Sequence, residues 1–426
     1  MDEHRPTGKV WPRAILIVGL AGFVTIAGVL ATATLPAPTP SAPVAAATLG
    51  SATADVPTDG PSPSRLVIPT SPPTPPAWQM VRTAFDDRIA LADEGAWGLN
   101  NRVLSLVYRT GAGGLSWRVA RFTATAGMEV FQPPAQIAEF RGGSVIDNRL
   151  WFFVRIGPQD SDEGDWRLFG TANGEAWKRL GVAEGLAGTH PAAFVGRVGG
   201  NWVSAVWPAG SSGSGAPTRE TLFWAADGVH WKRSAFPEGP GIVSFEGVGM
   251  LGESIVLLVQ RWTDFEDVAY SIVTSVDGKT WREAPLPVPP GSWPNGLACG
   301  HGRCIVGIRP LDEERPSPTQ AFLESSDAVH WTEVAVDAPY VDPDSQLSYL
   351  QVTRAGFIAT TGLASPVWLS GDGVTWRSVD VLPPGSPDSF HAFAVGGDVV
   401  VGTVEGESVV PDAFWQGSLA AMAAAP

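Results

Sequence analysis

The sequence predicts an all-β protein, a seven-bladed β-propeller with six or eight blades as the alternatives. A short pattern recurs along the chain, and its clearest copy is Ser275-Val-Asp277-Gly278-Lys-Thr-Trp281. Each copy lies between two β-rich runs, as 270–274 and 281–286 do around this one. Self-similarity at a period of about 20–50 residues is typical of solenoids and propellers, and the strand-rich composition favours the propeller.

The chemistry of the repeat explains its spacing. The Asp and Trp positions of the copies are Asn173 and Trp177, Asp227 and Trp231, Asp277 and Trp281, Asp327 and Trp331, and Asp372 and Trp376, with a degenerate copy over 111–117. Asp-Gly between two strands predicts a hairpin in which the Asp side chain bonds the backbone of the turn. The Trp falls on the returning strand, where its ring can cover the seam between sheets. A catalytic or metal-binding Asp is the alternative, but a role repeated in every blade is normally architectural.

This pattern resembles the Asp-box, or BNR, repeat of sialidases and sortilin-type propellers, over about residues 78–418. The family form is usually Ser-x-Asp-x-Gly-x-Thr-Trp, whereas here Gly278 directly follows Asp277 and the turn is one residue shorter. The resemblance implies the propeller fold and the repeat type. Few lysines and abundant Ala, Gly and Pro suggest a high-GC bacterial genome, so we expect a bacterial, membrane-anchored member.

The N-terminal region predicts an anchored protein. Residues 1–13 form a basic cytoplasmic segment, and 14–35 carry no charge over a length that can span a bilayer. The positive flank keeps the N-terminus cytoplasmic and places the rest outside the cell. A cleaved signal peptide is the alternative, and it would make the protein secreted. Residues 36–77, rich in Pro, Ala, Ser and Thr, form a linker.

Residues 78–419 are predicted to form the propeller, and 420–426 a tail. The last repeat supplies three strands, and the strand at 78–85 has no repeat turn before it. We therefore expect the N-terminal strand to complete the last blade and close the ring, which leaves no free sheet edge. The predicted outer-strand tryptophans are Trp78, Trp117, Trp177, Trp231, Trp281, Trp331 and Trp376.

Charge and cysteine content restrict the partners and the compartment. The net charge of −15 argues against nucleic acid, and we expect a monomer. Cys299 and Cys304 flank Gly-His-Gly-Arg, a spacing that favours a disulfide in an oxidising compartment. A metal site that includes His301 is the alternative, although it supplies only three ligands.

Two faces of the propeller are expected to differ. If the strands of a blade run A to D outward, the A–B turns and the repeat turns share one face. The longer, acidic B–C loops lie on the other face, where binding is expected. The predicted ligand-binding residues there are His190, Phe245, Trp262, Asp264, Trp293, Asp312, Tyr349 and His391. Packing at the top of the central channel is the alternative role for the aromatic members.

The preferred function is a membrane-tethered binding or scaffold module for a protein, glycan or cell-envelope ligand. The alternative is a sialidase-like exo-glycosidase, but Arg141, Arg197 and Arg354 fall toward the A–B turns, the wrong end for a sialidase site. No nucleophile triad, metal cluster or phosphate loop is visible, so no catalytic residue and no cofactor are predicted. Calcium at 160–165 is a weak alternative, because that loop lacks a full ligand set.

Overall fold

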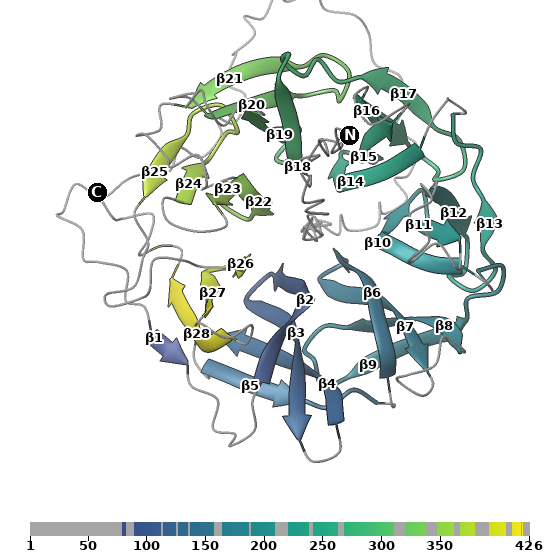
Figure 1. The fold of residues 1–426 in the computed structure, drawn as a ribbon, viewed down its shortest axis with the longest axis vertical. Coiled ribbons are helices and arrows are strands. Elements are labelled where there is room, and N and C mark those ends of the chain that lie inside the picture. The colour runs from purple at the N-terminus through teal and green to yellow at the C-terminus, as the bar shows by residue number, and fades with distance from the viewer. Residues whose placement is uncertain are drawn as a thin grey trace, which may run out of the picture.

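The computed structural model describes residues 79–81, 89–111, 114–124, 127–134, 137–156, 164–186, 189–208, 220–237, 242–262, 268–310, 320–336, 347–361, 367–379, 392–405, 411–418 and 420. Within them the chain forms seven four-stranded sheets, and every strand pairs antiparallel with its neighbour. The sheets follow one another in chain order around a centre (Figure 1). The predicted seven-bladed all-β propeller is confirmed.

The blades are numbered along the chain, with strands listed from the centre outward. Blade 1 is β2 (Ile89–Leu99), β3 (Arg102–Gly111), β4 (Gly114–Thr123) and β5 (Gly127–Phe131). Blade 2 is β6 (Ile137–Ile146), β7 (Arg149–Ile156), β8 (Asp165–Thr171) and β9 (Trp177–Val182). Blade 3 is β10 (Thr189–Val198), β11 (Asn201–Pro208), β12 (Thr221–Ala225) and β13 (Lys232–Arg233). Blade 4 is β14 (Ile242–Leu251), β15 (Ser254–Trp262), β16 (Val268–Ser275) and β17 (Arg282–Pro285).

Blade 5 is β18 (Ser292–Gly300), β19 (Arg303–Pro310), β20 (Gln320–Ser325) and β21 (Thr332–Val336). Blade 6 is β22 (Leu347–Thr353), β23 (Gly356–Thr361), β24 (Val367–Ser370) and β25 (Arg377–Val379). Blade 7 is β26 (Ala392–Gly396), β27 (Val399–Glu405), β28 (Pro411–Ser418) and β1 (Gln79–Val81).

The N-terminal strand closes the ring as predicted. β1 pairs antiparallel with β28, where Gln79 lies opposite Gln416 and Val81 opposite Phe414. Blade 7 thus combines the first strand of the chain with the last three (Figure 1). Joining the two ends of the domain in one sheet gives every blade the same four-stranded form and removes an open edge.

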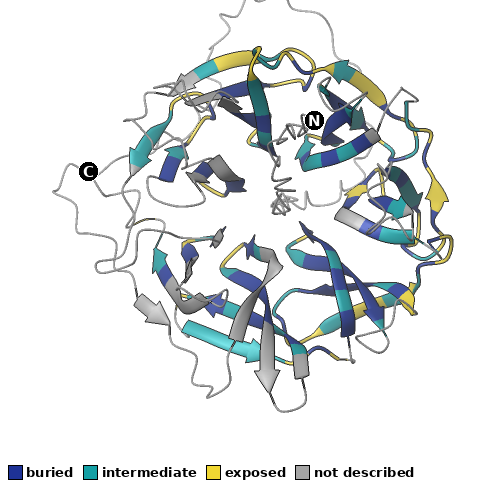
Figure 2. Ribbon diagram, in the orientation of Figure 1, coloured by how far each residue is buried: buried dark blue, intermediate teal, exposed yellow. Residues whose placement is uncertain are grey.

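The hydrophobic core lies between the blades. The seven central residues of β15 are all buried, whereas three of the four residues of the outer strand β17 are more exposed (Figure 2). Both faces of a middle strand pack against neighbouring blades, so these strands read as continuous apolar runs instead of alternating ones. The Ile255–Val259 run of β15 is fully buried for this reason.

One blade departs from the predicted repeat. Trp117 lies in β4, the third strand of blade 1, and not in an outer strand as its spacing suggested. The degenerate copy over 111–117 is therefore the connection between β3 and β4. The turn before the outer strand β5 falls at 124–126, which contains no Asp or Asn. The blade count is unaffected, because the four strands are present.

The five repeat turns are hereafter called the Asp turns (173–177, 227–231, 277–281, 327–331 and 372–376). They have the predicted hydrogen bonds between the Asp or Asn side chain and the backbone of the turn. Asp277 Oδ1 accepts the backbone N–H groups of Lys279 at 2.8 Å and Thr280 at 2.9 Å. These bonds, the one from Thr280 foremost, lower the pKa of Asp277, because they favour its ionised form. Ser275 Oγ accepts the N–H of Gly278 at 2.8 Å. The Asp side chain therefore holds the turn closed.

Each Asp turn also docks on the preceding blade. Trp376 of blade 6 stacks on Phe322 of blade 5, with ring centroids 4.3 Å apart, and Trp231 of blade 3 lies 5.3 Å from Phe153 of blade 2. Gly278 has φ +70°, and a Cβ there would lie 2.5 Å from Val203 of blade 3. The Asp-Gly-Trp spacing is thus an inter-blade contact, which supports its architectural interpretation.

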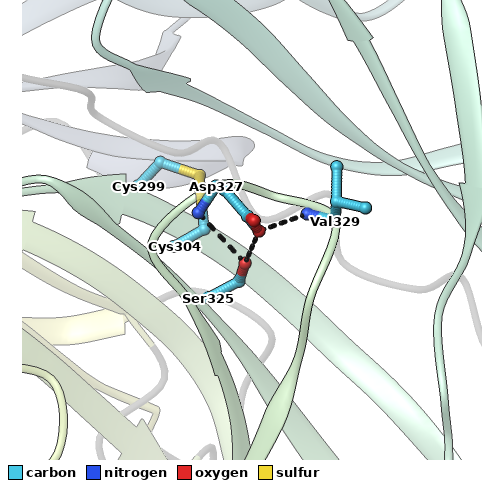
Figure 3. Close-up of a disulfide and its surroundings, with 5 residues drawn as sticks. All are labelled: Cys299, Cys304, Ser325, Asp327 and Val329. Carbon is cyan, nitrogen blue, oxygen red and sulfur yellow. Dashed lines mark hydrogen bonds between the residues drawn. A yellow bond between two sulfur atoms is a disulfide. The ribbon is translucent and has the colours of Figure 1, made fainter.

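The cysteines form the predicted disulfide. Cys299 and Cys304 lie opposite each other on β18 and β19, with sulfurs 2.03 Å apart. Cys304 also pairs with Ser325, whose Oγ lies 3.1 Å from Oδ1 of Asp327, the first residue of the blade 5 Asp turn (Figure 3). The Nε2 atom of His301 forms a hydrogen bond with the main-chain oxygen of Thr353, at 2.7 Å. The sulfurs are consumed by the bond, so the alternative metal site is not formed.

The predicted cytoplasmic segment, anchor and linker (1–77) lie outside the described residues. Among the residues that are described, no helix is long and apolar enough to cross a membrane.

Candidate functional site

The two faces of the ring are identified by its turns. The Asp-turn face carries the Asp turns together with the A–B turns, such as 300–303 beside Cys299 and Cys304. The loop face is the opposite one, where β15 ends at Trp262 and β18 begins at Ser292. The strand order thus separates uniform turns from the longer connections, as expected.

Three half-buried aromatic side chains meet at the loop face, between blades 4 and 5. The rings of Trp262 and Trp293 are 6.1 Å apart in a T-shaped arrangement. Tyr270 lies 6.3 Å from Trp293, tilted by 52°. Trp262 ends β15, Tyr270 lies on β16 and Trp293 lies near the start of β18. Sequence reasoning had selected both tryptophans, and the structure brings them together.

Polar groups line the blade 4 side of this cluster. Ser244 lies opposite Gln260, and Gln260 lies opposite Tyr270, so the three side chains share one face of the sheet. Gln260 Nε2 lies 3.4 Å from the Tyr270 hydroxyl. Burial raises the pKa of Tyr270, so its phenol stays neutral. The cluster therefore offers a neutral hydroxyl and an amide beside the aromatic rings.

Glu246 adds a carboxylate to the same cluster. It is the extra residue of a β-bulge, because Phe245 pairs with Val259 and Gly247 with Leu258. Its Oε1 accepts a hydrogen bond from Ser244 Oγ at 2.6 Å. Burial raises the pKa of Glu246, and its charge in turn acts on Tyr270. A β-bulge changes the direction of the side chain of its extra residue, which here is Glu246 on the innermost strand.

A second carboxyl lies deeper, between blades 3 and 4. Glu220 is 3% exposed; Trp207 Nε1 donates to its Oε1, and Phe245 N donates to its Oε2 at 2.9 Å. Its own N–H donates to the carbonyl of Val243 at 3.1 Å. Burial raises the pKa of Glu220 to about 8, and the negative charge of Glu246 adds to this. At neutral pH Glu220 is therefore largely protonated.

The acids of this region differ in their partners from four other glutamates of the ring. Glu139, Glu129, Glu283 and Glu324 each pair with an arginine. In the described part of the chain, neither Glu220 nor Glu246 has a cationic side chain within ion-pair distance. Leaving charge uncompensated beside buried groups is costly, so this arrangement distinguishes the blade 4 cluster from the rest of the ring.

A second aromatic contact lies at the loop face between blades 2 and 3. His190 lies 6.4 Å from Trp166, whose Nε1 donates to the carbonyl of Thr189 at 3.2 Å. Arg155 and Arg141 both bind Glu139, with N–O distances of 3.0 and 2.6 Å. The arginines are thus neutralised locally. His190 is on the expected face, but it lies between blades 2 and 3, whereas the aromatic cluster lies between blades 4 and 5.

The remaining predicted site residues have different outcomes. Phe245 is 1% exposed and packs against Phe194 and Phe236, so it belongs to the core and not to an accessible surface, contrary to the expectation. Tyr349 lies on β22. Its side chain and the residues Asp264, Asp312 and His391 lie outside the described part of the structure. Sequence reasoning missed Glu220, Glu246, Gln260 and Tyr270.

The arginines considered for a sialidase-type site lie in separate blades. Arg197 pairs with Asp147 at 3.3 Å, and Arg354 lies in the turn after β22. Arg141 is placed mid-strand on β6, closer to the loop face than expected, but it is bound to Glu139. Within the described residues no group of three His, Cys, Asp or Glu side chains could hold a metal ion. Most of the loop considered for calcium lies outside those residues.

Comparisons with known proteins show the fold alone. No protein-family model matches the sequence, and no curated protein matches it. An acylaminoacyl peptidase in complex with Z-Gly-Gly-Phe-chloromethyl ketone has a TM-score of 0.50 at 10% identity, over 78% of this chain and 51% of that one. The β-propeller domain of the Trilobed protease from Pyrococcus furiosus has 0.49 at 9%, over 79% and 97%. The phage phi92 endosialidase has 0.41 at 7%, over 80% and 68%.

Proposed function

We propose that this protein is a membrane-tethered, extracytoplasmic binding module that uses its loop face against a protein, glycan or cell-envelope ligand. The observation that carries the proposal is the half-buried cluster of Trp262, Trp293 and Tyr270 at that face. Aromatic rings left partly exposed beside polar groups on a rigid scaffold are typical of ligand sites, because they provide area at low entropic cost.

The topology of blade 7 supports the tethered arrangement. β1 begins beside the end of β28, since Gln79 pairs with Gln416, and Ser418 pairs with Val399 next to an A–B turn. The chain therefore enters the ring at the Asp-turn face. A tether leading into residue 79 would hold that face toward the membrane and present the loop face outward. We also propose that the Asp turns are related to Asp-box repeats.

The test compares variants of the full-length protein in detergent for capture of components from the native envelope. Trp262→Ala and Trp293→Ala should each lose the captured ligand while the melting temperature stays within a few degrees. Lys232→Ala, an exposed change on the outer strand of blade 3, is the matched control and should bind normally. Unchanged capture by both tryptophan variants would refute the proposal, as would a loss that only follows a falling melting temperature.

A glycosidase is the second candidate, and one observation favours it. Glu220 is a protonated carboxyl electrostatically coupled to Glu246, and glycoside hydrolysis uses a protonated and an ionised carboxyl. Against it, both Glu220 oxygens are already bound, to Trp207 and Phe245, and the group is buried. Turnover of a panel of fluorogenic glycosides, abolished by Glu246→Gln, would establish the enzyme and displace the binding module.

A further inference from the structure

We propose that the blade 4 cluster is a binding site for an alkylated ammonium group, held by the Glu246 carboxylate and the rings of Trp262, Trp293 and Tyr270. This inference rests on the proposed function, because it names the ligand chemistry of the same loop-face site. It begins from two features that are independent of each other: an inward acid without a cation, and a group of aromatic rings with exposed area.

The acid is the first feature. Glu246 Oε1 accepts a hydrogen bond from Ser244 Oγ, and among the described residues no cationic side chain lies within ion-pair distance of the carboxylate. Arg261 on the same blade shows the usual solution, since its guanidinium binds Glu283 through two nitrogens, each at 2.8 Å. Glu246 has the opposite effect on its neighbours: burial is the main cause of the raised pKa values of Glu220 and Tyr270, and the charge of Glu246 raises both further. A bound cation would offset the negative charge that acts on Glu220, Glu246 and Tyr270.

The aromatic rings are the second feature. Trp262 and Trp293 meet edge to face and remain half-buried, as does Tyr270. Elsewhere in the ring, tryptophan faces already carry protein cations: Lys279 lies 4.4 Å from Trp224, and Arg197 lies 5.4 Å from Trp202. In the described structure, no lysine or arginine is recorded over Trp262 or Trp293. These two rings therefore have no lysine or arginine partner among the described residues, and an aromatic face can bind a cation supplied by a ligand.

The combination selects an alkylated ammonium over other ligands. A bare ammonium requires about three acceptors, whereas the acceptors of this cluster are partly engaged already: the Glu246 carboxylate accepts from Ser244, and the Tyr270 hydroxyl accepts from Gln260. Methylated nitrogen needs no hydrogen bonds and gains from aromatic contact and from a nearby negative charge. The net charge of −15 also attracts cations and repels acidic ligands. An anionic sugar would meet Glu246 directly and is disfavoured.

The experiment measures binding of choline chloride to the full-length protein by titration calorimetry, beside its uncharged isostere 3,3-dimethylbutan-1-ol. We expect choline to bind about tenfold more tightly than the isostere, because only the cation gains from the aromatic faces and from the carboxylate. Glu246→Gln should weaken choline about tenfold and leave the isostere unchanged. Glu253→Gln, an exposed acid in the β14–β15 turn, is the matched control and should change neither.

Two further arms make the outcome decisive. Binding of the protein to phosphatidylcholine vesicles is compared with binding to phosphatidylglycerol vesicles. Preference for phosphatidylcholine identifies a lipid head group as the source of the cation, and binding of choline alone identifies a free amine. Equal binding of choline and its isostere, or no choline binding at 10-millimolar concentration, would overturn the inference. If envelope capture still depends on Trp262 and Trp293 in that case, the proposed function stands with an uncharged ligand. If capture ignores both tryptophans, the proposed function falls as well.

Discussion

Replacing Glu220 by glutamine should remove a large part of the pH dependence of stability. The folded protein holds a proton on this carboxyl up to a pKa of about 8, whereas the unfolded chain releases it near 4.5. Between these values the folded state binds more protons than the unfolded state, so the free energy of unfolding falls as pH rises. The stabilisation is complete below the unfolded pKa and is lost through the folded one.

The magnitude follows from the size of that interval. A separation from 4.5 to about 8 corresponds to a ceiling of about 5 kcal/mol lost between pH 4.5 and 8. Glutamine cannot ionise, so the variant lacks this loss. It also has one acceptor oxygen, where Glu220 accepts from both Trp207 and Phe245. Leaving one of these donors against an amide nitrogen costs about 1–3 kcal/mol at every pH.

The two stability curves should therefore cross. We expect the wild type to be more stable at pH 5 and Glu220→Gln to be more stable at pH 8, measured by urea unfolding with tryptophan fluorescence. His230, whose pKa is raised first by its hydrogen bond to Asp227, adds a slope of the same sign that both proteins share. Equal slopes for the two proteins between pH 5 and 8 would show that Glu220 is not held protonated.

Three further changes test the architecture by the same urea assay. Trp281→Ala should lower the free energy of unfolding by about 3–5 kcal/mol, because this side chain is 8% exposed within the core of blades 3 and 4; a loss below about 1 would exclude an inter-blade role. Gly278→Ala should lower the free energy of unfolding by more than about 1 kcal/mol, through strain at φ +70° and a clash with blade 3. Ala328→Gly, at the same position of the next turn with φ 60°, should be nearly neutral, because strain relief offsets the loss of a methyl group. Similar effects of both changes would contradict this reasoning. Replacing Cys299 and Cys304 together by serine should cost about 2 kcal/mol for so short a loop; no change would mean that the bond does not constrain the unfolded chain.

The fold was predictable because its signal is local. Asp277 and Gly278 specify their turn through bonds within five residues, and the Trp that follows contacts the preceding blade as its size requires. Closure by β1 was predictable from a missing strand. Blade 1 was misread where this local chemistry is absent, since its outer turn has no Asp and Trp117 happened to lie at a similar spacing from a glycine-rich connection.

The site was predictable only where strand ends are visible in the sequence. Trp262 ends an apolar run, and Trp293 follows the Pro-Pro-Gly-Ser connection before the next innermost strand, which is enough to place both at the loop face. Phe245 and Glu246 are adjacent, and a single bulge decides which of them enters the core and which joins the cluster. Alternation along β14 buries Val243 and Phe245 and leaves Ser244 and Glu246 half-buried, but it does not reveal the extra residue that follows Phe245 in the pairing with β15.

Glu220 shows why the acids escaped detection altogether. In the sequence it is one acid at the end of a long polar loop, where a solvated carboxylate is the ordinary expectation. Its burial results from the pairing of its backbone with Val243 on the next blade, and its partner Phe245 lies 25 residues away. The proton on Glu220 and the charge on Glu246 therefore depend on how two blades meet. The chemistry of a blade interface can therefore be derived only from the three-dimensional arrangement. The repeat that forms the interface, in contrast, can be recognised in the sequence of a single blade.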